Sequence, residues 1–155
     1  MPIARLTAEH CRVLELAGVL EKIAAGPRPP SSDLFMRARW NFTREVLRHL
    51  SHDEALVILP LMGDRRPHIA QLATQSREQL RMLSEDMENH MERWSGVPDL
   101  YEWTHYRREV QALIRRLRAR IAAEESGIYH FLPVQQPERR PAPATGRTHG
   151  TPHAA

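Results

Sequence analysis

Apolar residues recur every three or four positions through four long stretches of the chain, which is the period of α-helices that each bury one face. Short segments rich in glycine and proline separate the four stretches, and such segments end helices and form turns. The predicted helices span about residues 2 or 3 to 25, 34 to 61, 68 to 94 and 99 to 131. Four long helices joined by short turns predict an all-α fold, namely an up-down-up-down antiparallel four-helix bundle.

Polar residues interrupt the inward stripes of three helices. His49 and Asp53 stand one turn apart on the second helix, His10 lies on the stripe of the first, and Glu124 lies on the stripe of the fourth. The other members of these three stripes are Ile3, Leu6, Val13, Ala17 and Leu20; Phe42, Val46, Leu56 and Pro60; and Val110, Ile114, Leu117, Ile121, Ile128 and Phe131.

These inward polar residues have two interpretations. A buried charge needs a partner or a metal, and two imidazoles with two carboxylates converging at one level of the bundle form a plausible transition-metal shell. A buried histidine is also often a core residue that is hydrogen-bonded to a neighbour. Arg120, one turn before Glu124, can supply the positive charge that a metal would otherwise supply, and it would repel a cation. Taken alone, the residues therefore favour a metal-free polar core.

Three motifs, in this order, resemble the hemerythrin-like (HHE cation-binding) family over about residues 3–132. The motifs are Glu9-His10, then His49-Leu50-Ser51-His52-Asp53-Glu54 followed by Leu59-Pro60, and then Ile121-Ala122-Ala123-Glu124-Glu125 followed by Ile128-Tyr129. The resemblance implies a four-helix bundle that holds a non-haem di-iron centre through histidines and two bridging carboxylates. Members of the family bind oxygen or nitric oxide, or store or sense iron.

Carried over position by position, the resemblance implies the metal ligands His10, His49, Asp53 and Glu124. Asp53 stands where the family's second helix has a glutamate. Two ligand positions depart from the family, because Gln79 aligns with the histidine of the third helix and Arg120 replaces the histidine of the fourth. The di-iron ligand set is therefore incomplete.

The sequence thus predicts a hemerythrin-like domain with a reduced cation site, iron being the expected cation, that binds or senses iron, oxygen or nitric oxide. The alternative is a metal-free bundle that acts as a regulatory or protein-interaction module. No nucleophile elbow, phosphate-binding loop or Cys-x-x-Cys pair is present in the sequence, so we do not expect an enzyme.

Composition indicates which partners and which cellular compartment to expect for this domain. The 22 basic residues exceed the 19 acidic ones by only three, and the arginines of the fourth helix spread around it, so we expect no nucleic-acid partner. The single Cys11 excludes an internal disulfide and fits the cytoplasm, and no apolar run approaches the ~20 residues of a membrane span. We expect the bundle to occupy residues 1–133 and a disordered tail rich in proline and arginine to occupy residues 134–155.

Overall fold

The computed structural model describes residues 2–132, and the regular structure of these residues is helical. The elements are α1 (Pro2–Ala25), α2 (Ser32–Asp53), the π-helix η1 (Glu54–Ile58), α3 (Leu59–Met62), α4 (Pro67–Arg93), α5 (Leu100–Ser126) and the 3-10 helix η2 (Ile128–Phe131). Because α2, η1 and α3 follow one another without a turn, the chain forms four helical rods, as the sequence predicts. The tail predicted for residues 134–155 lies outside the described residues.

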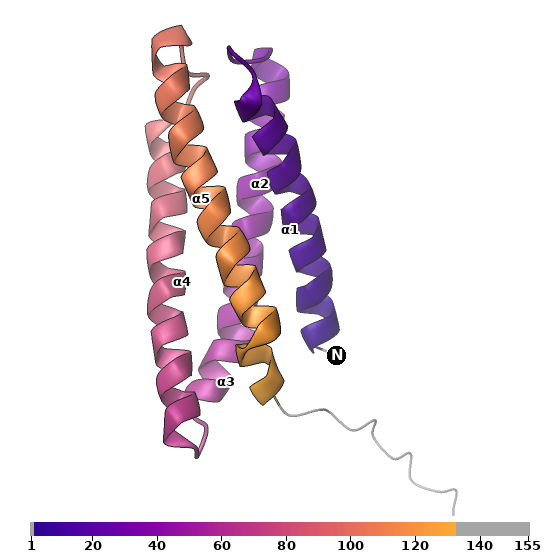
Figure 1. The fold of residues 1–155 in the computed structure, drawn as a ribbon, viewed down its shortest axis with the longest axis vertical. Coiled ribbons are helices and arrows are strands. Elements are labelled where there is room, and N and C mark those ends of the chain that lie inside the picture. Colours follow the sequence, from indigo (N-terminus) through magenta and orange to yellow (C-terminus); the bar gives the residue numbers. More distant parts are fainter. Residues whose placement is uncertain (1, 133–155) are drawn as a thin grey trace, which may run out of the picture.

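The four rods are antiparallel neighbours in an up-down-up-down bundle (Figure 1). Helix α1 contacts α2 and α5, and α4 also contacts α2 and α5, so the rods enclose one core. The turn before α5 is fixed by a capping box, in which Asp99 accepts from the Glu102 main chain and the Glu102 carboxylate accepts from the Asp99 main chain. The fold prediction is confirmed.

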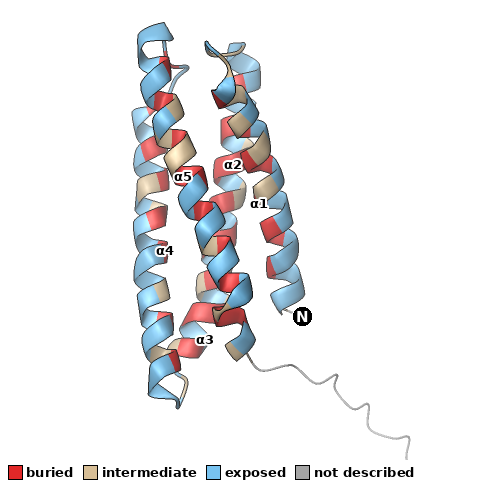
Figure 2. Ribbon diagram, in the orientation of Figure 1, coloured by how far each residue is buried: buried red, intermediate tan, exposed pale blue. Residues whose placement is uncertain are grey.

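Most residues of the predicted stripes on α1, α2 and α5 are buried (Figure 2), but Ile3 is exposed. On α4, where the expected stripe began at Leu72 and Ser76, Leu72 is exposed, and Ile69 and Ala73 are buried instead.

The apolar core is divided into a large cluster and a smaller one near α3. On α1, Val13 belongs to the large cluster and Leu6 to the small one, and in the fourth rod the same division separates Ile121 of α5 from Ile128 of η2. The inward polar residues lie at the level between the two clusters, which makes them a polar layer inside an otherwise apolar core.

The second rod departs from its predicted register after Asp53. Leu56 and Pro60 were expected on the buried stripe, but Pro60 is exposed, and Val57 and Leu61 are buried instead. The reason is the π-helix η1, in which the main-chain N–H of Leu59 bonds to the carbonyl of Glu54, five residues earlier. This wider turn holds one extra residue and shifts the inward face by one position.

The fourth rod was expected to be one helix as far as residue 131, but it breaks at Gly127. A Cβ atom at this position would lie 2.8 Å from the carbonyl oxygen of Ala123, so the bend accommodates only glycine without movement. Beyond the break, η2 turns Ile128 and Tyr129 into the small apolar cluster.

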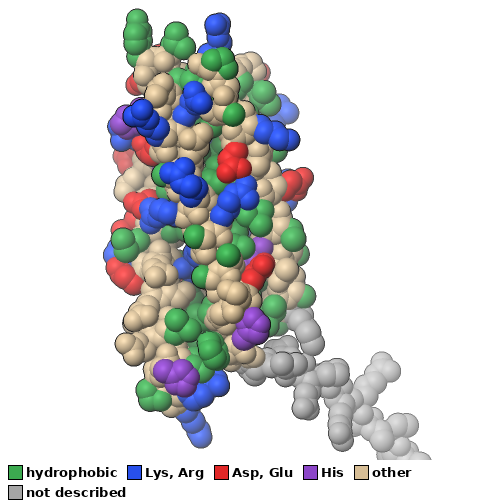
Figure 3. Space-filling model, viewed as in Figure 1, with side chains coloured by type: hydrophobic (Ala, Val, Ile, Leu, Met, Phe, Trp, Pro, Cys, Tyr) green, Lys and Arg blue, Asp and Glu red, His purple; other side chains and the backbone are tan. Residues whose placement is uncertain are grey.

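The surface shown in Figure 3 mixes basic and acidic side chains. Several arginines of α5 are exposed, and two of them form ion pairs with acids of other helices, Arg116 with Asp86 and Arg118 with Glu21. None of the helices in residues 2–132 combines the length and the apolar character that a membrane span requires.

Candidate metal centre

Three of the four predicted ligands meet in the polar layer. The Nε2 atoms of His10 and His49 lie 3.2 Å apart, and the Oε2 atom of Glu124 lies 3.0 Å from the first and 3.5 Å from the second. These side chains come from α1, α2 and α5 and are all buried. One donor atom of each lies within 4.8 Å of the other two, which is a spacing that one cation can bridge.

Both imidazoles direct Nε2 to the centre and Nδ1 toward a carboxylate. The Nδ1 of His10 donates to Oε1 of Glu125 at 2.7 Å, and the Nδ1 of His49 lies 3.5 Å from Oε2 of Glu9. Metal-binding histidines commonly have such a carboxylate behind them, because it fixes the tautomer and the ring orientation. Neither Nδ1 of His49 nor Oε2 of Glu9 has a hydrogen-bond partner within the described residues, so this second contact is an ion-pair contact and not a formed hydrogen bond.

Glu9 connects the centre to the surface. Its Oε1 atom accepts a hydrogen bond from Nδ1 of His52 at 2.8 Å and one from Nε of Arg5 at 3.2 Å. Burial opposes ionisation of Glu9, but the hydrogen bonds from His52 and Arg5 outweigh it and lower the pKa of Glu9. Glu9 is therefore an ionised carboxylate that stands behind His49.

Asp53, the fourth predicted ligand, is fully buried but is not one of these three converging donors. Its Oδ2 atom accepts a hydrogen bond from Nη2 of Arg120 at 2.7 Å. The same guanidinium places Nε 2.5 Å from Oε1 of Glu124 and donates from Nη1 to the carbonyl of Ser76 at 3.2 Å. Arg120 thus pairs with both buried carboxylates.

The charges of the layer depend on these contacts. Burial opposes protonation of His10, but its hydrogen bonds to Glu124 and Glu125 outweigh that cost and raise its pKa. Burial also opposes ionisation of Glu124, yet the two histidines and Arg120 lower its pKa. For Asp53, burial and the nearby charge of Glu124 raise the pKa even though Arg120 acts in the opposite direction.

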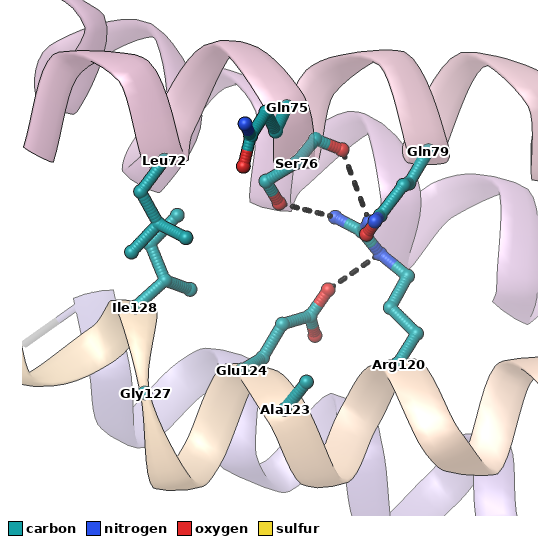
Figure 4. Close-up of a pocket in the computed structure, with 9 residues that line it drawn as sticks. All are labelled: Leu72, Gln75, Ser76, Gln79, Arg120, Ala123, Glu124, Gly127 and Ile128. Carbon is teal, nitrogen blue, oxygen red and sulfur yellow. Dashed lines mark hydrogen bonds and ion pairs between the residues drawn. The ribbon is translucent and has the colours of Figure 1, made fainter. Parts of the chain in front are cut away.

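A pocket of about 160 Å³ between α4 and α5 leads toward the layer (Figure 4). Ser76 and Gln79 line it on α4, and Arg120 and Glu124 line it on α5. Figure 4 shows the Arg120 side chain spanning from α5 to Ser76 and the Glu124 carboxylate pointing between the helices. The Arg120 guanidinium and the Glu124 carboxylate line the pocket, whereas His10 and His49 are not among its lining residues.

Sequence reasoning assigned no role to Tyr129, although this residue closes the layer on the side of η2. The hydroxyl oxygen of Tyr129 lies 3.2 Å from Nε2 of His10 and 3.4 Å from Oε2 of Glu124. Its ring stacks on the His10 ring with a centroid separation of 5.6 Å. Burial, followed by the charges of Glu124 and Asp53, raises the pKa of Tyr129, so the hydroxyl is protonated in the metal-free protein.

These residues fit one cation better than two. The donors of His10, His49 and Glu124 suit a transition metal, and a carboxylate backs each imidazole. The carboxylate oxygens that would hold a second ion, Asp53 Oδ2 and Glu124 Oε1, are paired with Arg120 instead. A buried guanidinium at that position repels a second cation, so the di-iron arrangement does not fit this chain.

The position on α4 that aligns with a family histidine supplies no imidazole. Gln79 is exposed on α4, where it lines the pocket. The buried histidine of α4 is His90, whose Nδ1 donates to Glu109 at 2.9 Å and which packs against Tyr106. His90 therefore belongs to a different part of the core.

One of three comparisons with known proteins gave a match, and it agrees with the predicted family. Neither the curated proteins nor the solved structures gave a match to the chain. The sequence profile of the hemerythrin HHE cation-binding domain matches residues 1–132, which is the whole bundle. The chain belongs to the hemerythrin HHE cation-binding domain family.

Proposed function

We propose that the bundle binds one transition-metal cation, with iron as the first candidate, through His10, His49 and Glu124. The observation that carries the proposal is the convergence of three buried donor atoms from three helices, with a carboxylate behind each imidazole. Membership of a cation-binding family supports the same reading. In this proposal Asp53 holds Arg120 rather than the cation.

The physiological role that we propose is the binding or sensing of iron, or of a small diatomic molecule such as oxygen or nitric oxide at the iron. The pocket between α4 and α5 supports this role because it reaches Glu124. We propose a binding function and assign no catalytic step to the centre.

The test is metal binding to the purified chain. After anaerobic incubation with ferrous iron and gel filtration, the parent should retain about one iron per chain. Its melting temperature should rise with iron, because a ligand bound only to the folded state stabilises that state by mass action. Glu124→Gln should bind iron at least tenfold more weakly, while His68→Gln, which changes an exposed histidine at the start of α4, should bind it like the parent. A parent that retains no iron and shows no shift in melting temperature would refute the proposal.

A second candidate, a metal-free interaction module, is favoured by exposed apolar side chains near the bundle end where α2 and α5 begin. Trp40 is 60% exposed, Leu100 is 65% exposed and Tyr101 is 94% exposed. Figure 3 shows hydrophobic side chains at this end of the molecule. Iron content separates the two candidates, because the module would bind no iron, and replacing Trp40 and Tyr101 with serine would abolish its association with a partner.

A further inference from the structure

We propose that the hydroxyl oxygen of Tyr129 is a fourth donor to the cation, which makes the centre a four-coordinate site of two histidines, one glutamate and one tyrosine. This inference rests on the proposed function, because it concerns the same cation. It adds a ligand that neither the predicted ligand set nor the family match assigns.

The first support is the position of the hydroxyl group. Tyr129 is 4% exposed, and its oxygen atom lies 3.2 Å from Nε2 of His10 and 3.4 Å from Oε2 of Glu124. The oxygen thus points at the same two atoms that would hold the cation, rather than toward solvent.

The second support is the set of separations among the four donor atoms. Five of the six separations are known, and they are 3.2, 3.0, 3.5, 3.2 and 3.4 Å. A tetrahedral metal with bonds of about 2.0–2.1 Å has ligand atoms roughly 3.3 Å apart. These five separations therefore match the ligand-to-ligand distances of such a tetrahedral shell.

The third support is the break in the fourth rod. Five residues of continuous α-helix would rotate Tyr129 by about 140° from Glu124, away from the centre. The break at Gly127 and the 3-10 turn of η2 bring the phenol back over His10, where the two rings stack. The local fold thus directs this side chain at the cluster.

Chemistry favours a phenolic oxygen at this place. A phenolate is a hard anionic ligand that suits ferric iron, and it brings a negative charge that the two neutral imidazoles cannot supply. On binding, the metal–oxygen bond replaces the O–H bond of Tyr129, and the proton leaves to the buffer. The metal does not change its oxidation state in this step.

The experiment loads the folded chain with ferric iron delivered as ferric citrate, removes excess iron by gel filtration, and measures iron content and visible absorption. A tyrosinate bound to ferric iron produces a charge-transfer band, which an imidazole and carboxylate shell lacks. The parent should show this band with about one iron per chain, and resonance Raman excitation within the band should enhance phenolate ring vibrations. The Raman spectrum needs only the parent, so it decides the matter even if a variant does not fold.

Two phenylalanine variants complete the test. Tyr129→Phe keeps the ring but removes the oxygen, so it should lose the band and bind ferric iron at least tenfold more weakly. Tyr106→Phe is the matched control, because Tyr106 is a fully buried tyrosine of α5 whose ring contacts Phe35 and Trp103, and it should keep the band. Stoichiometric iron without the band, or a band that survives in Tyr129→Phe, would overturn the role of Tyr129 and leave the proposed function standing. A parent that takes up no iron would overturn both.

Discussion

Replacing Arg120 with methionine tests whether this side chain neutralises the buried carboxylates. The Arg120 side chain is 8% exposed and pairs with Asp53 at 2.7 Å and with Glu124 at 2.5 Å. Methionine keeps most of the length of the side chain but removes the charge, so two buried carboxylates lose their common partner. Breaking a buried pair by removing one partner costs about 3–5 kcal/mol, which is a large part of a typical folding free energy of roughly 5–15 kcal/mol.

The assay is urea denaturation of the metal-free protein followed by circular dichroism. Arg116→Met is the matched control, because Arg116 lies one turn earlier on α5, is about half exposed and, among residues 2–132, pairs only with Asp86 at the surface. Its free energy of unfolding should stay within about 0.5 kcal/mol of the parent. The double variant Arg120→Met with Asp53→Asn should regain about 1 kcal/mol or more relative to Arg120→Met, since one unpaired charge is then gone.

The same variants distinguish a structural arginine from one that takes the place of a cation. If the guanidinium replaces a second ion, ferrous iron should raise the melting temperature of Arg120→Met more than that of the parent. The reasoning is refuted if Arg120→Met is as stable as the parent, because the carboxylates then do not depend on the guanidinium. If iron raises the melting temperatures of both proteins equally, Arg120 does not take the place of a second ion, but its role in neutralising the carboxylates still stands.

Three further predictions concern the rest of the bundle. Gly127→Ala should lower the free energy of unfolding by about 1–3 kcal/mol, because the added Cβ would lie 2.8 Å from a main-chain carbonyl oxygen. Gly18→Ala on α1 should raise the free energy of unfolding by up to about 1 kcal/mol, because its Cβ would meet nothing within 4 Å. Urea denaturation of the two variants checks both the predicted loss and the predicted gain. Burial lowers the pKa of His90 below its ordinary 6.5, so the unfolded chain binds more protons and the parent should lose stability as the pH falls below 6.5; in His90→Gln, thermal melts across this range should show a flatter dependence. Combining Arg120→His with Gln79→His should increase the iron-dependent rise in melting temperature above that of the parent, and an equal rise would show that imidazoles at these two positions do not bind the cation.

Helical periodicity was sufficient to predict the bundle and the meeting of three ligands. His10, His49 and Glu124 each occupy a place on an apolar stripe, and stripes of antiparallel helices face one another. The period also predicted that Asp53 is buried and that Arg120 could pair with Glu124, and the structure confirms both statements. Metal binding itself stays a prediction.

Other features of the centre depend on departures from regular α-helix. The spacing of apolar residues in the sequence does not reveal such departures. Tyr129 enters the layer only because the helix breaks at Gly127, and Val57 takes the expected place of Leu56 only because η1 is a π-helix. Glu125 lies about 100° around α5 from the stripe, yet its long side chain still reaches His10. Glycine beside an apolar pair near the end of a predicted helix is the one signal that could have suggested the break.

Charge balance explains why this layer suits one cation. In the metal-free protein, Arg120 offsets the carboxylates of Asp53 and Glu124, and the hydrogen bonds of His10 to Glu124 and Glu125 favour its protonated form. A single divalent ion that replaces the His10 proton adds one net positive charge, and ionisation of Tyr129 removes it again. A second divalent ion beside Arg120 would leave two buried positive charges without partners, at a cost of several kcal/mol for each. In the proposed site the arginine and the tyrosine would therefore act together, since Arg120 would take the place of one ion and Tyr129 would complete the shell of the other.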